Sequence, residues 1–278
     1  MSKPTLSFEF FPPRDEDGRE RLVTNVADKL QGLNPKYFSV TYGAGGSTRD
    51  GTRQTVAELL AAGHHAVPHL SMGGSDVTSL KTLLDEYQAL GVTNIVALRG
   101  DQPSGMGASR FDFNAEALIR LIRSHSGSAF DLIVAAYPEV HPDASSAASD
   151  LDFFARKVDA GANIAITQYF YNIEAYEDFV NRCVQRGINI PIIPGVMPIT
   201  NYESIVRFSE RAGAEIPRWL DYALRDRADD PEALNAFGVE YVTSLCEKLI
   251  ALGVPSFHFY TLNRWGSTTR ICQNLGLA

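Results

Sequence analysis

The chain has 278 residues, of which 45% are hydrophobic, and a formal net charge of −8 at pH 7. This length accommodates one (β/α)8 barrel of roughly 250 residues or two smaller domains. The sequence has no basic run, which argues against nucleic acid or an anionic membrane as a partner, and no apolar run approaches the roughly 20 residues of a membrane span.

Eight short apolar runs recur along the chain, and each ends in a polar or conformationally special residue. They are Leu6–Phe11, Tyr37–Tyr42, Ala66–Leu70, Ile95–Leu98, Leu132–Tyr137, Ile164–Phe170, Ile190–Pro194 and Phe257–Tyr260. Helical stretches are expected between them, over residues 15–31, 49–62, 77–90, 114–125, 148–160, 174–186 and 201–212. This alternation predicts an α/β fold, a single (β/α)8 TIM barrel over residues 1–278 with its chemistry at the strand ends.

The interval between the seventh and eighth runs is longer than the others. It contains a short segment, Pro217–Leu224, and a helical stretch that reaches about Leu252, so extra helices are expected between strands seven and eight. A C-terminal helix is expected over Ser267–Leu275. The Gly- and Ser-rich stretch Pro103–Phe113 is expected to form a long loop after the fourth strand, where it could act as a lid.

The cysteines and histidines give no metal-binding pattern. Cys183, Cys246 and Cys272 are far apart, so we expect free thiols in or near the core and a cytoplasmic protein. The first strand begins too near the N-terminus to leave room for a signal peptide. His64 and His65 are adjacent rather than helically spaced, and the glycine spacings of a Rossmann unit or P-loop are missing.

Glu9 is the sharpest single candidate for chemistry. Alternation along the first strand places it on the face opposite Phe8 and Phe10. A carboxyl group at the inner mouth of a barrel is desolvated, which suits it to hold and donate a proton near neutral pH. The alternative is a carboxylate that pairs with an arginine at the rim.

Polar groups also end three other strands. Arg99, Gly100 and Asp101 end the fourth, where the glycine admits a flat ligand and the aspartate would place a negative charge beside it; an ion pair in a turn is the alternative. Gln168 ends the sixth, and its amide can donate and accept at once, as a pyrimidine-like edge requires, although a structural role fits equally. His69, at the end of the third, is open to the same two interpretations.

The fifth strand is followed by a loop with two prolines, residues 137–142. These prolines favour an extended loop in which Tyr137 and His141 could stack on a cofactor or bond to it. Asp150 and Lys157 lie two helical turns apart on the next helix and therefore on one face. Lys157 could bind a phosphate there, or it could be an ordinary solvated lysine.

Taken in order, these motifs resemble the methylenetetrahydrofolate reductase family in its short bacterial form. The matching segments cover nearly the whole chain: Ser7–Pro13, Ser39–Ala44, Pro68–Leu70, Ala97–Asp101, Ala135–His141, Lys157–Ala162, Ile166–Phe170 and His258–Arg264. The resemblance implies an oxidoreductase that binds FAD and uses NADH or NADPH to reduce 5,10-methylenetetrahydrofolate to 5-methyltetrahydrofolate, the methyl source for methionine synthesis. It further implies a ping-pong scheme through the flavin, and likeness to the short bacterial members favours NADH.

The resemblance also implies roles for individual residues. Glu9 matches the family's general acid, Asp101 the carboxylate beside flavin and pterin, and Gln168 an amide that contacts pterin and nicotinamide. Phe208 matches an aromatic that stacks on a substrate ring, and Arg264 matches a folate contact. The matches to nucleotide and FAD contacts are Thr41, Tyr42, Ala44, His69, Arg99, Gly100, Asp101, Tyr137, His141, Asp150 and Lys157.

Two positions depart from the family pattern. Ser204 stands where a folate-contacting glutamine precedes Phe208 by one helical turn, and Phe113 stands where a tyrosine is common. We expect no regulatory domain of the kind found in the longer eukaryotic form, and therefore no inhibition by S-adenosylmethionine. The family likeness implies a homo-oligomer. The alternatives are a related flavin barrel such as a proline dehydrogenase, or a non-catalytic subunit of a larger reductase.

Overall fold

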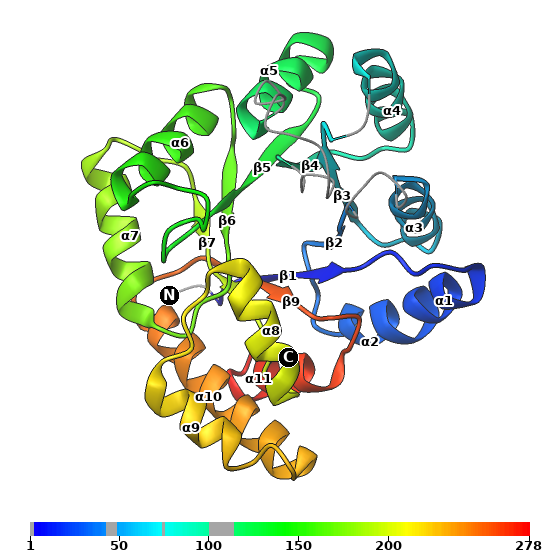
Figure 1. Cartoon of the computed structure of the whole chain (residues 1–278). Helices are drawn as coiled ribbons and strands as arrows, with labels where there is room; N and C mark the ends of the chain where they lie inside the picture. The colour runs from blue at the N-terminus through cyan, green and yellow to red at the C-terminus, as the bar shows by residue number, and fades with distance from the viewer. Residues whose placement is uncertain (1–2, 43–48, 74–75, 100–113) are drawn as a thin grey trace.

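A curled sheet of parallel strands forms the centre of the molecule (Figure 1). The computed structural model describes residues 3–42, 49–73, 76–99 and 114–278. Within these residues the strands are β1 (Thr5–Phe10), β2 (Tyr37–Val40), β3 (Ala66–Ser71), β4 (Asn94–Leu98), β5 (Asp131–Ala136), β6 (Ile164–Thr167), β7 (Ile192–Ile193), β8 (Gly195–Val196) and β9 (Ser256–Tyr260). Their order is β7-β6-β5-β4-β3-β2-β1-β9-β8, and all the pairings are parallel.

The seventh predicted strand is divided at Pro194 into β7 and β8. Proline has no N–H to give to a ladder, so regular pairing is interrupted there. β7 pairs with β6 and β8 pairs with β9, while the Pro194 carbonyl accepts a hydrogen bond of 3.1 Å from the His258 N–H. The divided strand therefore joins the two ends of the sheet, and the predicted barrel is confirmed with one broken strand.

Helices surround the barrel, and α3 to α7 form a ring outside β2 to β7 in Figure 1. They are α1 (Glu16–Arg21), α2 (Asp28–Gln31), α3 (Arg49–Ala61), α4 (Val77–Ala89), α5 (Ala115–Ser126), α6 (Ala147–Asp159), α7 (Ile173–Gln185), α8 (Tyr202–Ala212), α9 (Arg218–Arg225), α10 (Pro231–Ala251) and α11 (Gly266–Asn274). A π-helical turn, η1 (Leu22–Ala27), joins α1 to α2, so the predicted first helix is continuous but locally underwound. None of the helices described is long and apolar enough to cross a membrane.

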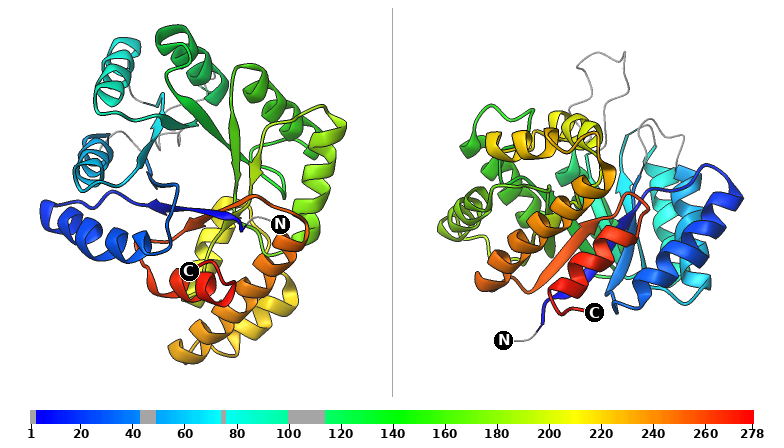
Figure 2. Two further views of the ribbon diagram at one scale, coloured as in Figure 1. Left: turned by 180° about the vertical axis from the view of Figure 1, so that it is seen from behind. Right: turned by 90° about the horizontal axis from the view of Figure 1, so that it is seen from below.

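The long interval before the last strand contains α8, α9 and α10, which confirms the predicted insertion. Figure 2 shows α8 at the end of the barrel opposite the two termini, where the strands finish. Asn201 caps α8 by accepting a hydrogen bond from the Ser204 N–H at 2.8 Å. α10 approaches the segment before α8 closely, because a Cβ at Gly238 would lie 2.3 Å from the Ile199 carbonyl oxygen.

Alternate residues of the strands fill two separate layers. Phe8, Phe10 and Phe38 point outward and are fully buried against the helices, with the rings of Phe10 and Phe38 stacked at 5.2 Å. A second cluster fills the barrel interior and consists of Tyr37, Val67, Val96, Ile133, Ile166 and Ile193. The three cysteines are buried free thiols, as predicted. The barrel interior is thus a packed core that leaves its upper end for polar residues.

Candidate active site

Glu9 lies inside the barrel at the end where the strands finish. The register of β1 pairs it with Ser39 on β2 and Tyr260 on β9, and 12% of its side chain is exposed. Phe8 and Phe10 lie on the opposite face of the strand, as alternation predicted. Among the described residues, Glu9 meets two histidines and no arginine within 4.0 Å, so the rim ion pair is not the arrangement seen there.

Both histidines approach the same oxygen of Glu9. Nε2 of His69 lies 3.5 Å from Oε2, and Nε2 of His258 lies 3.7 Å from it. Burial lowers the pKa of His69 to about 4, with the charge of Glu9 opposing the shift in part. His69 is therefore neutral near pH 7, and its Nε2 has no hydrogen-bond partner within the described part of the chain.

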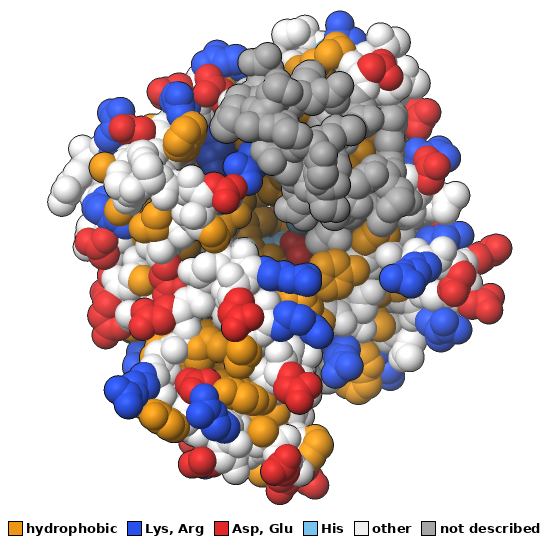
Figure 3. Space-filling view, viewed as in Figure 1, with side chains coloured by type: hydrophobic (Ala, Val, Ile, Leu, Met, Phe, Trp, Pro, Cys, Tyr) orange, Lys and Arg blue, Asp and Glu red, His pale blue; other side chains and the backbone are white. Residues whose placement is uncertain are grey.

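His258 is fixed by hydroxyl groups from neighbouring strands. Its Nδ1 lies 2.7 Å from Oγ of Ser7, and its Nε2 lies 3.4 Å from Oγ of Ser39. The hydroxyl of Ser7 also donates to the Phe257 carbonyl at 3.3 Å. The histidine is 1% exposed, so this network holds it away from solvent beneath Glu9. In Figure 3 the face of the molecule is hollowed at its centre, and acidic and histidine side chains are visible at the floor.

The loop after β5 is held in one conformation by α6. The Asp150 carboxylate accepts a hydrogen bond of 2.9 Å from the His141 N–H, and Nδ1 of His141 accepts one of 3.0 Å from the Asp143 N–H. Val140, with φ of 76°, takes a left-handed conformation that is uncommon for a β-branched residue. The rings of Tyr137 and His141 meet edge to face, with centroids 4.5 Å apart. The predicted pair of rings is therefore formed, and the helix fixes its position.

Two cations come to the same region from β4 and α6. Nη2 of Arg99 lies 2.5 Å from the Asp143 carboxylate, which attaches the end of β4 to the loop after β5. Nζ of Lys157 donates to the Ala135 carbonyl at 2.5 Å, and burial lowers the pKa of this lysine to about 8. Burial, followed by the charge of Arg99, lowers the pKa of His141. Lys157 is thus a half-buried cation beneath the mouth rather than a solvated surface lysine.

Gln168, Thr41 and Tyr42 each follow directly after a strand. The Gln168 N–H donates to the Ala136 carbonyl at 2.7 Å, and its side-chain oxygen accepts from the Tyr169 N–H at 3.0 Å. Thr41 continues the β1–β2 ladder through its N–H, which donates to the Phe10 carbonyl at 2.9 Å. The hydroxyl of Tyr42 is buried and has no partner within the described residues. All three lie at the same end of the barrel as Glu9, and Gln168 and Thr41 are anchored there by their backbone.

The other two predicted substrate contacts, Phe208 and Arg264, lie on segments that border the mouth. Phe208 is half-buried on α8, which is attached to the segment after β6 by a contact of 3.1 Å between Tyr169 Oη and Ser209 Oγ. Arg264 is exposed on the turn after β9. In that turn the side chain of Asn263 bonds to both the N–H and the carbonyl of Phe11, at 2.8 and 2.9 Å. The ends of β1 and β9 are therefore bound together beside Glu9.

Some predicted positions lie outside the described residues, and two residues to which the sequence analysis gave no role stand out in the structure. Ala44, Gly100, Asp101 and the loop Pro103–Phe113 belong to the first group. Glu139 belongs to the second: it accepts a hydrogen bond of 2.8 Å from the Glu215 N–H, and burial raises its pKa to about 7. His258 also does, although its place two residues before Tyr260 on an inward-facing strand could have indicated it.

The polar groups of this mouth suit a flat, polar heterocycle. Three buried polar atoms there have no partner within the described residues: Tyr42 Oη, His69 Nε2 and Glu139 Oε1. Unpaired buried polar atoms are destabilising unless a ligand or water satisfies them, so they provide bonds for the edge of a ring system. Arg99 and Lys157 supply positive charge for an anionic part of such a ligand.

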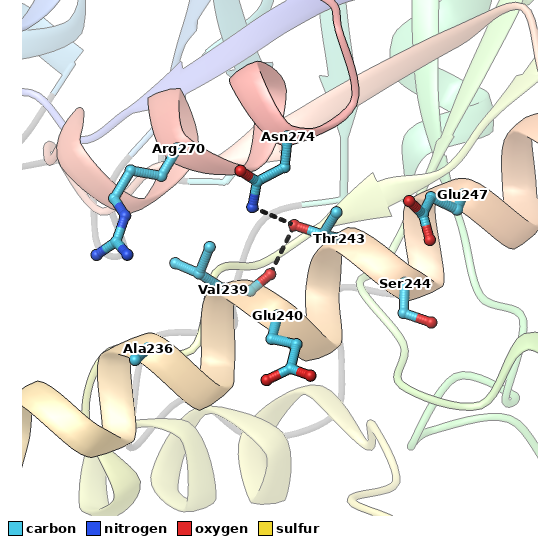
Figure 4. A pocket seen from close by; sticks show the side chains of 8 residues that line it. All are labelled: Ala236, Val239, Glu240, Thr243, Ser244, Glu247, Arg270 and Asn274. Carbon is cyan, nitrogen blue, oxygen red and sulfur yellow. Dashed lines mark hydrogen bonds between the residues drawn. The ribbon is translucent and has the colours of Figure 1, made fainter.

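A second concave feature, on the outer wall, involves none of the predicted residues. It is a groove between α10 and α11 (Figure 4), and its lining includes Glu240, Glu247 and Arg270. Its polar groups bond partly to one another, since Asn274 donates to Thr243 Oγ1 at 3.4 Å. The mouth around Glu9 is accordingly the candidate active site.

Comparison with known proteins identifies the family. The model of the family described as methylenetetrahydrofolate reductase matches residues 1–276. The 5,10-methylenetetrahydrofolate reductase of Escherichia coli K12 is 41% identical over 273 residues, which is 98% of this chain and 90% of that protein. Methylenetetrahydrofolate reductase (NADH) 1 of Arabidopsis thaliana is 38% identical over the whole of this chain, which spans 49% of the plant protein.

A solved structure supports the fold independently. An uncharacterised Clostridium thermocellum protein, described as binding two copies of 5-methyl-5,6,7,8-tetrahydrofolic acid, superposes with a TM-score of 0.69 at 17% identity. The match covers 98% of this chain and 93% of that one. With the family match and the close bacterial relatives, these findings confirm the resemblance noted from the motifs. The chain belongs to the methylenetetrahydrofolate reductase family of oxidoreductases.

Proposed function

We propose that this chain reduces 5,10-methylenetetrahydrofolate to 5-methyltetrahydrofolate with FAD as bound cofactor and NADH, in preference to NADPH, as hydride donor. The observation that carries the proposal is the nearly buried carboxyl group of Glu9 at the mouth, within 3.5 and 3.7 Å of two imidazoles. Such a group is placed to transfer a proton to a substrate in a dry site.

Glu9 is proposed to donate its proton to the amine nitrogen that leaves when the five-membered ring of the substrate opens. The opened folate is a cation, and it becomes the methyl product when it accepts a hydride. When bound, FAD would supply hydride chemistry at this mouth, with the pyridine nucleotide as the source of the hydride in a separate half-reaction. Asp101 is proposed to stabilise the cationic folate by its negative charge.

The residues proposed to hold FAD that the structure describes lie on β3 and α6 or follow β2, β4 and β5. His69 and Tyr42 offer unpaired buried polar atoms for the ring edge, and the paired rings of Tyr137 and His141 offer an aromatic surface. The remaining proposed contacts are Thr41, Ala44, Arg99, Gly100, Asp101, Asp150 and Lys157. Asp150 acts through His141, whose loop it orients, and Lys157 supplies a cation that is held by the Ala135 carbonyl of β5.

Folate is proposed to lie between Gln168, Phe208 and Arg264. The amide of Gln168 matches the donor and acceptor pattern of a pterin edge, and the half-buried ring of Phe208 offers a stacking surface. Arg264 is exposed, which suits contact with the carboxylate tail. Ser204 lies on the same helix as Phe208 but is shorter than glutamine, so we expect the tail to rely more on Arg264 in this chain.

The test is to measure the two half-reactions separately in the Glu9→Gln variant by anaerobic rapid mixing. Flavin reduction by NADH should be close to the wild-type rate, and reoxidation by methylenetetrahydrofolate should slow at least about 100-fold, because a general acid contributes roughly this much. Glu20→Gln makes the same chemical change at an exposed position and should leave both rates unchanged. Normal folate reduction in Glu9→Gln would refute the role of Glu9.

The wild-type spectrum tests the proposal as a whole. A flavin spectrum that bleaches on addition of NADH and recovers on addition of methylenetetrahydrofolate would support cofactor, donor and acceptor together. Bound flavin that neither NADH nor NADPH reduces would favour a non-catalytic subunit, and reduction by proline would favour the related dehydrogenase.

A further inference from the structure

We propose that Asn263 is a positioning residue for the folate tail. Its side chain bonds the turn that carries Arg264 to the end of the strand that carries Glu9, so that the cation proposed to meet the tail keeps a fixed place relative to the carboxyl group at the mouth. The inference rests on the proposed roles of Glu9 and Arg264. It adds the residue that determines how strongly the chain distinguishes a substrate with tail carboxylates from one without them.

The first step is the way in which Asn263 joins two strand ends. The regular pairing of β1 with β9 ends at Glu9 and Tyr260. Two residues after Glu9, the amide of Asn263 takes the place of a backbone partner: its Oδ1 accepts a hydrogen bond of 2.8 Å from the Phe11 N–H, and its Nδ2 donates one of 2.9 Å to the Phe11 carbonyl. Because one partner donates and the other accepts, both bonds form in only one orientation of the amide.

The second step is a further connection from Asn263 to Glu9 itself. Thr261 is 4% exposed, and its hydroxyl donates to the Glu9 carbonyl at 2.7 Å. The same hydroxyl accepts a hydrogen bond of 3.2 Å from the Asn263 N–H. Successive hydrogen bonds reinforce one another where water is excluded. Asn263 is therefore tied to the end of β1 at two points, the carbonyl of Glu9 and the backbone of Phe11.

The third step is the backbone of the turn. The Arg264 N–H donates to the Thr261 carbonyl at 3.0 Å, which closes a tight turn, and the two residues between them, Leu262 and Asn263, have φ of 52° and 56°. Asparagine tolerates this left-handed region, but leucine does so only at a cost. Such conformations persist where the surroundings hold them, and they are concentrated at functional sites. The bonds to Phe11 provide that hold.

The fourth step is what this hold does for Arg264. Its side chain is exposed and long, so its own contacts do not fix it, and the backbone from which it extends decides where the guanidinium can reach. Arginine binds a carboxylate through two parallel hydrogen bonds, which depend strongly on geometry. Loss of the Asn263 bonds should therefore weaken recognition of the tail more than the chemistry of the ring system.

The kinetic test uses Asn263→Gly, because glycine accepts a positive φ without strain and lacks the amide. The rate constant for reoxidation of the reduced flavin is measured with 5,10-methylenetetrahydrofolate and with 5,10-methylenetetrahydropteroate, which has no glutamate tail. Their ratio cancels any shared effect on Glu9. In the wild type the tail should raise the rate constant about tenfold or more, as one charge-assisted contact does. In Asn263→Gly the ratio should fall at least about fivefold, towards that of Arg264→Ala.

Asn163→Gly is the matched control. The amide of Asn163 also joins neighbouring strands, but at the opposite end of the barrel, where its oxygen accepts from the Leu132 N–H at 2.8 Å and from Arg123 at 2.5 Å. Its ratio should equal that of the wild type even if the chain is less stable. An unchanged ratio in Asn263→Gly, or an equal fall in Asn163→Gly, would overturn the inference.

A second measurement needs no turnover. Hydrogen exchange followed by NMR of apoprotein labelled with nitrogen-15 phenylalanine reports the Phe11 amide, which is assigned by its loss in Phe11→Tyr. The side chain of Phe11 is 43% exposed, so the bond to Asn263 should be what protects this amide. Exchange should be at least about fivefold faster in Asn263→Gly and unchanged in Asn163→Gly, and equal exchange in Asn263→Gly and the wild type would refute the inference.

Failure of the proposed function would look different. A wild-type protein that reduces neither folate compound would refute the proposed reaction, and an Arg264→Ala variant that keeps the advantage of the tail would refute the proposed role of Arg264. The exchange rate of the Phe11 amide would still decide whether Asn263 holds the turn.

Discussion

Replacing Gly238 by alanine is expected to destabilise the barrel, although the same change in an open helix is stabilising. Alanine is favoured over glycine inside a helix by about 1 kcal/mol. At Gly238, however, the new Cβ would lie 2.3 Å from the Ile199 carbonyl oxygen and 3.0 Å from the Ile199 Cβ, where ordinary contact begins at 3.4 Å. The backbone oxygen cannot rotate away, so α10 must move by about 1 Å, and overpacking of this kind costs about 3 kcal/mol.

The net loss is about 2 kcal/mol, which corresponds to a fall in Tm of roughly 3–4 °C for a chain of this size. Urea unfolding and thermal melts of the apoprotein measure it. Gly266→Ala is the control, because nothing lies within 4 Å of a Cβ there, and its stability should equal or slightly exceed that of the wild type. Since Ile199 precedes the cap of α8, Gly238→Ala should also raise the KM for folate. A Gly238→Ala variant as stable as Gly266→Ala would refute the reasoning.

Two further predictions concern buried charges near the mouth. Lys157→Met should lower the affinity for FAD about tenfold or more, because it removes a cation from the proposed cofactor site. The stability of the apoprotein near pH 7 should be retained, because burial lowers the pKa of this lysine to about 8 and its charge is costly to bury. Flavin fluorescence titration measures the affinity, and an unchanged value would contradict the prediction. Burial raises the pKa of Glu139 to about 7. Between about pH 4.5 and 7 the folded chain therefore binds more protons than the unfolded chain, and the free energy of unfolding falls as the pH rises. Glu139→Gln should flatten that slope in urea unfolding at about pH 5 and about pH 7, and an unchanged slope would exclude this carboxyl as its source.

Much of the fold was predictable because the strands of a barrel have local signatures. The apolar runs, the polar residues that follow them and the glycines after helices, such as Gly91 and Gly187, are features of neighbouring residues. The division of the seventh strand at Pro194 was not predicted. The run Ile190–Pro194 predicts a strand that ends at the proline, whereas the pairing resumes with β9 one residue later.

The candidate site was predictable in part. Glu9, His69 and Gln168 were identified because each sits at a strand end, and the barrel brings strand ends together. The contact between Glu9 and His258 was not predictable from the sequence. Two of the six histidines approach the same carboxyl oxygen of Glu9, and they come from parts of the chain far from it. Similarly, helical spacing placed Asp150 and Lys157 on one face, but only packing shows that Asp150 holds the backbone of His141.

The pairing of β9 between β1 and β8 has a consequence for how this protein is made. β1 is synthesised long before its partner on one side, Ser256–Tyr260, which emerges only after some 250 further residues have been added. Until then β1 presents an unpaired edge, and the late closure has the high contact order that slows folding. Because Ser7 and Glu9 belong to the first strand and His258 to the last, the carboxyl group proposed to transfer a proton meets His258 only when the ring of strands closes. A folding intermediate that lacks this closure is therefore expected to be unable to reduce folate, however much of the helical shell it has formed.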